Sequence, residues 1–154
     1  SILKIAKKKK MKLLPLAGVL TVSMLLFGTA GFGQCRAFTK NKCLPQLAPY
    51  TSNGQYSGAT LFEGETATII QTFYAEQEYR LLICTQESLG DGVTFAVKNQ
   101  DGSTIYSSEG KEENYWDFKV EGTQQFAIEI SIPSTNVSDI KNEGCVSIMV
   151  GFKP

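Results

Sequence analysis

Gln125–Ile132, with the sequence QFAIEISI, decides the fold class of this chain. From Phe126 onward its apolar side chains fall on every second position, and the positions between them carry polar or small residues. A period of two is typical of a β-strand with one buried and one wet face. Cys145–Phe152, CVSIMVGF, repeats the pattern from Val146, and Val93–Lys98 repeats it in a shorter form. The chain is therefore predicted to be built from strands.

Short turn signals separate the candidate strands at regular intervals. Asn-Gly, Asp-Gly and Glu-Gly pairs supply residues that tolerate positive φ or bond their own backbone. The predicted strands are 59–63, 66–74, 78–85, 93–99, 104–107, 115–120, 125–132 and 145–152. Outside the apolar leader, no window of ten residues shows helical spacing. About eight strands of this length predict an all-β fold, a single antiparallel β-sandwich of jelly-roll or immunoglobulin-like type.

An apolar leader precedes the predicted sandwich. Leu13–Phe32 is uncharged, follows a lysine-rich start, and ends in small residues at Gly31-Phe-Gly33. A positive end, an apolar middle and small residues at the cleavage point form the layout of a secretory signal peptide. We therefore predict a signal peptide over 1–33, and a start at Met11, with Ser1–Lys10 upstream of it, remains an open alternative. The mature chain then opens with Gln34, in the style of Bacteroidetes-type bacteria.

Two other uses of the leader remain open. An apolar run of about twenty residues is long enough to stay in a bilayer as an anchor, although Pro15 interrupts its start and glycines thin its far end. A lipoprotein signal would acylate Cys35, but Gln34 stands where such a signal needs a small residue. Cleavage is the prediction. It places the protein in the periplasm or at the cell surface, with the membrane touched only through the signal peptide.

The four cysteines, Cys35, Cys43, Cys84 and Cys145, are predicted to form disulfides because an exported chain meets an oxidising compartment. A zinc site is disfavoured, since the chain has no histidine and its cysteines lack short paired spacings. The simplest of the three possible pairings joins Cys35 to Cys43 and Cys84 to Cys145. Both strand cysteines fall on rows that face away from the core, so a bridge between them requires neighbouring strands. Otherwise each pairs with the N-terminal segment, laid across the outer face.

Residues 34–58 are predicted to form an extended N-terminal segment ahead of the sandwich at 59–154. The stretch Cys43–Tyr50, CLPQLAPY, is punctuated by prolines, which exclude it from a central strand. Such a segment either covers a strand edge against aggregation or serves as a docking arm for a partner protein. The two uses remain open.

Removing the leader changes the charge of the chain. Six of the fifteen basic residues precede Gln34 and all fifteen acidic residues follow it, so the mature chain carries 9 minus 15, or minus six. An acidic domain repels phosphate backbones, so nucleic acid is not a predicted partner. Solubility is a sufficient explanation for the acidic surface.

Catalysis is not predicted. Without histidine the chain has no Ser-His-Asp or Cys-His arrangement, and disulfides occupy the thiols. Paired carboxylates at Glu112-Glu113, or at Glu63 with Glu65, are the residue types that a glycosidase needs. Both pairs fall in predicted turns, where acidic side chains are commonly just solvated.

Aromatic residues offer a candidate binding site. Tyr115 and Asp117 alternate with Trp116 and Phe118, so we expect the first two on the wet face and the last two in the core. Together with Tyr106, the residues Tyr115 and Asp117 make up the possible ligand-binding set. Exposed aromatic rings of this kind are what a sugar-binding face needs.

Two loops carry oxygen ligands for calcium. Asp91 lies in Gly90-Asp-Gly92 and Asp101 lies in Asn99-Gln-Asp-Gly102, and hard cations take carboxylate and carbonyl oxygens. The dense alternation of acids in a calcium loop is absent, so both stretches are interpreted as turns. Beyond this calcium option, no metal or cofactor is predicted.

Val93–Ile132 resembles small extracytoplasmic sandwich domains. It contains a strand, the turn at 99–102, Ile105-Tyr106, a polar break, Trp116-Asp-Phe118 and a return strand. This hairpin-plus-return pattern is similar to that of the bacterial pre-peptidase C-terminal domain and of the Golgi-dynamics domain. The resemblance implies an accessory, non-catalytic module that helps a larger exported system to bind or fold.

The predicted function is that of an exported, non-catalytic β-sandwich protein with a binding or structural accessory role at the cell envelope. Its predicted partner is an envelope protein or a glycan. A carbohydrate-binding module is the first alternative, and a carboxylate-dependent glycosidase comes third.

Overall fold

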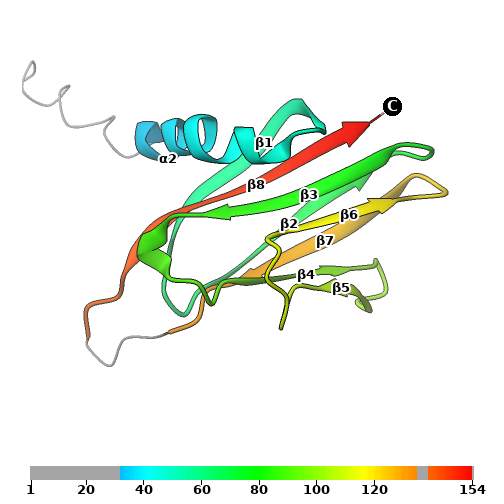
Figure 1. Ribbon diagram of the computed structural model, residues 1–154. Coiled ribbons are helices and arrows are strands. Elements are labelled where there is room, and N and C mark those ends of the chain that lie inside the picture. The colour runs from blue at the N-terminus through cyan, green and yellow to red at the C-terminus, as the bar shows by residue number, and fades with distance from the viewer. Residues whose placement is uncertain (1–31, 135–138, 154) are drawn as a thin grey trace, which may run out of the picture. The chain divides into compact units, whose positions relative to one another are not determined.

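The computed structural model describes residues 32–134 and 139–153, so the predicted leader lies outside the described residues. Eight strands form two four-stranded antiparallel sheets (Figure 1). Sheet A has the order β1-β8-β3-β6, and sheet B has the order β2-β7-β4-β5. The strands are β1 (Thr51–Phe62), β2 (Thr66–Phe73), β3 (Glu78–Thr85), β4 (Thr94–Lys98), β5 (Thr104–Ser107), β6 (Tyr115–Lys119), β7 (Gln124–Ser131) and β8 (Glu143–Lys153).

The strand order selects the jelly-roll option. Among the described strands, the chain alternates between the two sheets, and only β4 and β5 are both consecutive in sequence and neighbours in a sheet. An immunoglobulin-like sandwich would keep its first two strands in one sheet, whereas here β1 and β2 belong to different sheets. Two sheets of four strands with these crossovers form a jelly roll. The predicted antiparallel sandwich is confirmed.

The main core lies between the sheets and uses alternate side chains of each strand. Phe126, Ile128 and Ile130 of β7 are buried there, as their spacing predicts. Trp116 and Phe118 of β6 pack against the same core, which confirms their predicted orientation. Burial of alternating apolar side chains against an opposing sheet is the main stabilising contribution in such a sandwich.

Residues 32–47 are helical, so the predicted extended conformation is wrong there. An α-helix, α2 (Phe32–Phe38), runs into a π-helical turn, η3 (Thr39–Cys43), and a 3-10 turn, η4 (Leu44–Leu47). A helix this short is unstable alone, so packing must hold it. Pro45 is tolerated because it lies at the start of η4, where a backbone N–H has no helical partner. None of the described helices is long and apolar enough to span a bilayer.

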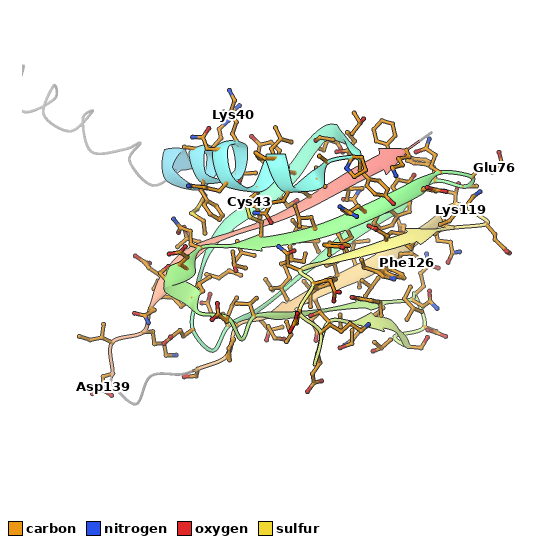
Figure 2. All side chains as sticks on the ribbon, in the orientation of Figure 1. Lys40, Cys43, Glu76, Lys119, Phe126 and Asp139 are labelled. Atoms are coloured by element: carbon orange, nitrogen blue, oxygen red, sulfur yellow. A yellow bond between two sulfur atoms is a disulfide. The ribbon has the colours of Figure 1, made fainter. Side chains whose placement is uncertain are left out.

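From residue 34 on, this helical segment lies against the outer face of sheet A and builds a second core there. The buried side chains of this second core are Cys43, Leu47, Leu82, Cys84 and Met149, with Phe38 and Tyr115 packed against them. Figure 2 shows Cys43 on the side of the segment that faces the sheet. Both faces of β3 and β8 are covered, one by sheet B and the other by the helical segment. These strands therefore carry apolar residues on both faces.

Two disulfides fasten the helical segment to the sheet. Cys35 pairs with Cys145, and Cys43 pairs with Cys84, with Cα separations of 5.3 and 5.7 Å. The simplest predicted pairing is therefore wrong, and pairing with the N-terminal segment is confirmed. It occurs although β3 and β8 are neighbours. Cys84 lies opposite Ser147, so Cys145 is its diagonal neighbour, and diagonal Cα atoms are about 7–8 Å apart, beyond the usual reach of a disulfide.

The first and last residues of the strands lie close to the predicted ones, except in the first strand. The structure begins β1 at Thr51, well before the predicted start at Ala59. The register of β1 against β8 is interrupted between Ser52 and Tyr56. This irregularity, together with the many polar residues of the stretch, hides the alternation that sequence analysis relies on.

Candidate functional site

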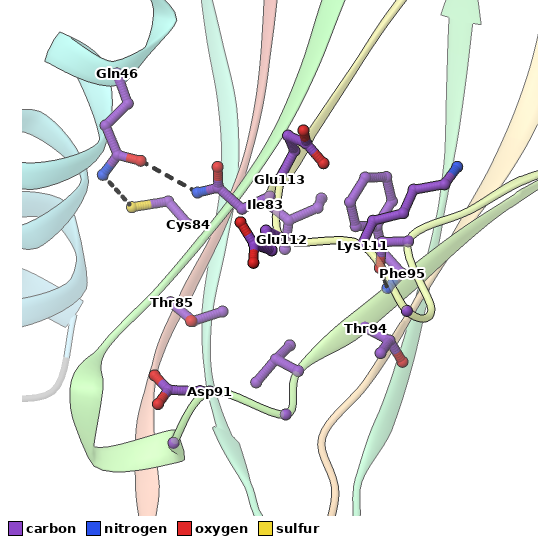
Figure 3. A pocket seen from close by; sticks show the side chains of 16 residues that line it. Gln46, Ile83, Cys84, Thr85, Asp91, Thr94, Phe95, Lys111, Glu112 and Glu113 are labelled. Atoms are coloured by element: carbon purple, nitrogen blue, oxygen red, sulfur yellow. Dashed lines mark hydrogen bonds between the residues drawn. The ribbon is translucent and has the colours of Figure 1, made fainter.

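A cleft of about 640 Å³ opens at the end of the sandwich where β3 ends and β4 begins (Figure 3). Two loops, 90–92 and 110–114, contribute to its lining. Its floor includes the buried side chains of Ile83 and Phe95. Ser108 fixes this floor, because its hydroxyl accepts a hydrogen bond from the Phe95 N–H at 2.8 Å and its own N–H donates to the Phe95 carbonyl at 2.9 Å.

Three carboxylates lie on the rim of this end cleft. Asp91 comes from the first loop, and Glu112 and Glu113 come from the second. All three are exposed to solvent. Lys111 also lines the cleft, and its Nζ lies 3.9 Å from the centre of the Tyr106 ring, a cation–π contact. The structure thus brings together Asp91 and the Glu112-Glu113 pair, which the sequence placed in separate loops.

The helical segment forms one wall of the end cleft through Gln46. The Gln46 side-chain amide donates to the Lys42 carbonyl at 2.8 Å and lies 3.5 Å from Cys84 Sγ. Its carbonyl oxygen accepts a hydrogen bond from Asn114 Nδ2 at 3.1 Å. Sequence analysis missed this link, because nothing local marks a glutamine in an exposed turn as a partner for a loop almost seventy residues later, at a separation of 68.

The calcium candidates are not brought together. Asp91 precedes β4 and lines the end cleft, whereas Asp101 lies in the turn beyond the other end of β4. Asp101 instead accepts hydrogen bonds from the Ser103 N–H at 2.9 Å and the Ser103 hydroxyl at 2.6 Å. Those bonds, the hydroxyl first, lower the pKa of the Asp101 carboxyl. Within 32–134 and 139–153, no group of three acidic or cysteine side chains is placed to hold a metal ion.

Glu63 and Glu65 hold the turn between β1 and β2. Glu63 is only 1% exposed, and its Oε1 accepts a hydrogen bond from Asn142 Nδ2 at 3.1 Å. Glu65 Oε2 accepts one from the Phe62 N–H at 2.9 Å. A glycosidase needs both carboxyl groups facing a substrate. These two carboxyl groups are instead engaged with the protein itself.

The possible ligand-binding set is divided between two sides of sheet A. Tyr115 and Asp117 lie on the outer face, where both contact Arg80 of the neighbouring strand. Asp117 accepts two hydrogen bonds from the guanidinium, at 2.7 and 2.8 Å, and Arg80 lies 4.0 Å from the centre of the Tyr115 ring. Tyr106 lies on the inner side, stacked on Trp116 with ring centres 4.8 Å apart.

Arg80 is the organising residue of the outer cluster, which consists of Arg80, Asp117, Tyr115 and Tyr50. Its guanidinium lies 4.7 Å from the Tyr50 ring, and Nη1 donates to the Ala48 carbonyl at 3.4 Å. The bond to Asp117 raises the pKa of Arg80, and burial followed by the Asp117 charge raises the pKa of the Tyr50 phenol. The cluster thus ties the chain ahead of β1 to the sheet. Its polar groups are used within the protein.

Trp116 lies in a row of aromatic rings. Its ring stacks on Phe118 at 4.1 Å and on Tyr106 at 4.8 Å, with planes inclined by 16° and 18°. These two rings already occupy much of the π surface of the indole. A flat, free tryptophan face for a sugar ring is therefore not present on β6.

No family model matches the chain, and no curated protein matches it. Among solved structures, the chain is similar to PliG of Aeromonas hydrophila, a periplasmic lysozyme inhibitor of g-type lysozyme. The two are 12% identical with a TM-score of 0.48, over 68% of this chain and 89% of that chain. A de novo designed double-stranded β-helix is 11% identical with a TM-score of 0.32, over 64% of this chain and 99% of that one. At these values neither likeness carries an argument about function.

Proposed function

We propose that this chain is an exported, non-catalytic binding protein of the cell envelope. The observation that carries the proposal is the disulfide pairing of Cys35 with Cys145 and of Cys43 with Cys84. Disulfides of this kind persist in oxidising compartments and are rare in the cytosol. They begin one residue after Gln34, where the mature chain is predicted to start, so the export prediction and the disulfides support the same compartment.

The absence of catalysis is supported by what the candidate catalytic groups do. The whole chain contains no histidine. Glu63 and Glu65 hold a turn, and Glu112 and Glu113 are exposed on a rim. A glycosidase general acid needs an environment, such as an apolar pocket, that keeps its carboxyl protonated. The exposed rim provides no such surrounding.

The binding role is supported by the rigidity of the frame around the end cleft. One wall is held by a disulfide at Cys84 and by the Gln46–Asn114 hydrogen bond, and the floor is held by Ser108. Clefts whose walls are fixed before binding lose little entropy when a ligand enters.

The test begins with location and thiol state. The full chain, leader included, is expressed in a bacterial host and recovered from each cell fraction. We expect a mature N-terminus at Gln34, and non-reduced peptide mapping should find Cys35–Cys145 and Cys43–Cys84. An intact leader on a cytoplasmic protein with four free thiols would contradict the proposal.

Catalysis and binding are then measured on the mature protein. Chromogenic glycosides should show no hydrolysis above that of a Glu112→Gln, Glu113→Gln variant, which removes both rim carboxylates of loop 110–114. Hydrolysis that this variant abolishes would contradict the non-catalytic assignment. Binding to washed envelope material is measured by co-sedimentation, and a chain that stays in the supernatant at all concentrations would contradict the binding role.

A further inference from the structure

A second opening lies at the other end of β3. It is a groove of about 420 Å³ between the two sheets, on the side where β1 and β2 are the edge strands. Its floor includes Tyr79 and Val150, which are 5% and 6% exposed, and the half-buried Phe152. None of these residues belongs to the binding set predicted from the sequence. Three independent features of the groove point to a ligand.

The first feature is the wall made by the irregular part of β1. The register break between Ser52 and Tyr56 places Asn53 and Gln55 on the lining of the groove. Local bonds hold this bulge: the Gly54 N–H donates to Ser52 Oγ at 3.1 Å, and the Gln55 N–H donates to Asn53 Oδ1 at 2.9 Å. Bulges commonly re-aim side chains beside binding sites.

The second feature is a glutamine in a row that faces the core. In β2, Gln71 lies opposite the buried Phe126 of β7, on the same face as Ile69 and Phe73. It is half-buried and lines the groove, and its amide makes a long hydrogen bond of 3.4 Å to the Thr72 carbonyl. A polar residue in a core-facing row is a local inconsistency of the kind that marks functional sites.

The third feature is an aromatic ring presented from a fixed backbone. Tyr74 lines the groove and is 60% exposed. Its N–H donates to the hydroxyl of the buried Tyr79 at 2.9 Å, and that hydroxyl lies 3.3 Å from the Tyr74 carbonyl, to which it donates. A large exposed ring on an immobilised backbone is pre-organised for contact, since little main-chain freedom is lost on binding.

The chemistry of the lining selects the class of ligand. Among the described residues, it contains four primary amides, from Asn53, Gln55, Gln71 and Gln77, and no charged side chain. A primary amide offers two donors and an acceptor, which suits neighbouring hydroxyl groups, and a tyrosine ring offers an apolar face. We propose that this groove binds a neutral, hydroxyl-rich glycan. The proposal rests on the binding role given above, adds a second site to the end cleft and names a ligand class for it.

An extended peptide is the rival occupant, because β2 is an edge strand. The observations favour the glycan. The Tyr74 backbone, one residue past the end of β2, already bonds to the Tyr79 hydroxyl, so it is not available to extend strand pairing beyond β2. The lining also presents side-chain amides and an exposed ring, which suit neighbouring hydroxyl groups and a sugar face better than an extended main chain.

The test uses the mature, disulfide-bonded protein. Native gels containing a neutral polysaccharide (starch, dextran, mannan, xylan or mixed-linkage β-glucan) should retard the wild-type chain in at least one gel. Tyr74→Ala and Gln77→Ala should each weaken that retardation about tenfold, as expected for loss of a stacking ring or of hydrogen bonds. Tyr74→Phe keeps the ring and should keep most of the binding.

Matched controls come from the same molecule. Tyr56→Ala removes another exposed tyrosine, which lies on the outer face of β1 opposite Met149, and Gln100→Ala removes a glutamine at the β4–β5 turn. Both should bind like wild type. Circular dichroism and thermal melting of every variant establish that a loss of retardation is not a loss of folding.

Several results would overturn the groove assignment. One is that none of the five polysaccharides retards the wild-type protein. Another is that Tyr56→Ala weakens the retardation as much as Tyr74→Ala does. A third is that an uncharged extended peptide competes with the polysaccharide for binding. If folded Tyr74→Ala is retarded by the polysaccharide as wild type is, the groove assignment fails, while co-sedimentation of wild type with envelope material tests the proposed binding function separately. If wild type itself does not co-sediment, the broader function fails.

Discussion

The outer face of sheet A is covered by other parts of the chain, whereas the outer face of sheet B is exposed to solvent. Sheet A carries the helical segment, a second core around Leu82 and Met149, and two disulfides. Sheet B shows its outer face to solvent, where Ile70 is 64% exposed and Lys98 pairs with Glu129 at 3.0 Å. The difference teaches that alternation identifies the shared core reliably. The apolar residues Leu82 and Met149 on the outward row of sheet A lie under another layer, whereas Ile70 on the outward row of sheet B is exposed.

The largest expected effect is the loss of a disulfide from sheet A. Cys35→Ser with Cys145→Ser frees a loop with a sequence separation of 110, and Cys43→Ser with Cys84→Ser frees one of 41. Loop-closure entropy predicts losses of about 5 and about 4 kcal/mol in the free energy of unfolding. Urea denaturation of both variants beside wild type measures them. Losses below about 1 kcal/mol would show that the helical segment is held by packing alone.

A smaller effect is expected from trimming the second core. Leu82→Ala removes a fully buried side chain beneath the helical segment, and should lower the free energy of unfolding by about 2–4 kcal/mol. Ile70→Ala, on the open outer face of sheet B, is the matched control and should change it by less than about 0.5 kcal/mol. Chemical denaturation compares the two. Equal losses would remove the distinction between the two faces.

Removing the ion pair on each face should change the free energy of unfolding by smaller amounts than the core substitution. Arg80 makes two hydrogen bonds to Asp117 and contacts two tyrosine rings, with its side chain 13% exposed. We expect Arg80→Ala to cost about 1–3 kcal/mol. Lys98→Met, at the half-exposed pair on sheet B, should cost less than about 1 kcal/mol. Thermal melts of both variants give the order, and a larger loss in Lys98→Met would contradict it.

The smallest expected effect is on the titration of Asp101, in the turn that connects β4 and β5 of sheet B. The Ser103 bonds lower the pKa of Asp101 from its ordinary value of 3.8. A lowered carboxyl pKa contributes stability above the ordinary value, and this contribution is lost as the pH falls through the lowered value. NMR titration of the Asp101 carboxyl carbon should show the low value, and Ser103→Ala should raise it. An unchanged titration in Ser103→Ala would assign the shift to another cause.

The sequence predicted the sandwich well because its strands carry their own signal. Phe126, Ile128 and Ile130 alternate strictly, and turns with glycine separate them from the neighbouring strands. The placement of Trp116 in the core followed from the same parity. Such local patterns are independent of distant partners, so they can be read without the structure.

The helical segment and the candidate sites were harder to predict because they depend on distant partners. Nothing between Cys35 and Leu47 favours a helix strongly, and the segment is helical because sheet A and two disulfides hold it. Leu82 and Met149 are apolar residues at positions predicted to face solvent, and they were the available indication that the helical segment covers this face. Gln71 was a similar signal for the groove, since it interrupts an apolar row. The role of Arg80 required knowledge of its partner strand.

The disulfide connectivity also bears on how the chain matures. The pairs are nested, since Cys43 and Cys84 lie between Cys35 and Cys145 in the sequence. The N-terminal part of a chain is made and released first, so Cys35 and Cys43 meet each other before either native partner is available. A premature bond between them has to be undone by thiol–disulfide exchange. Production of this protein in quantity should therefore benefit from an isomerase or a glutathione redox buffer.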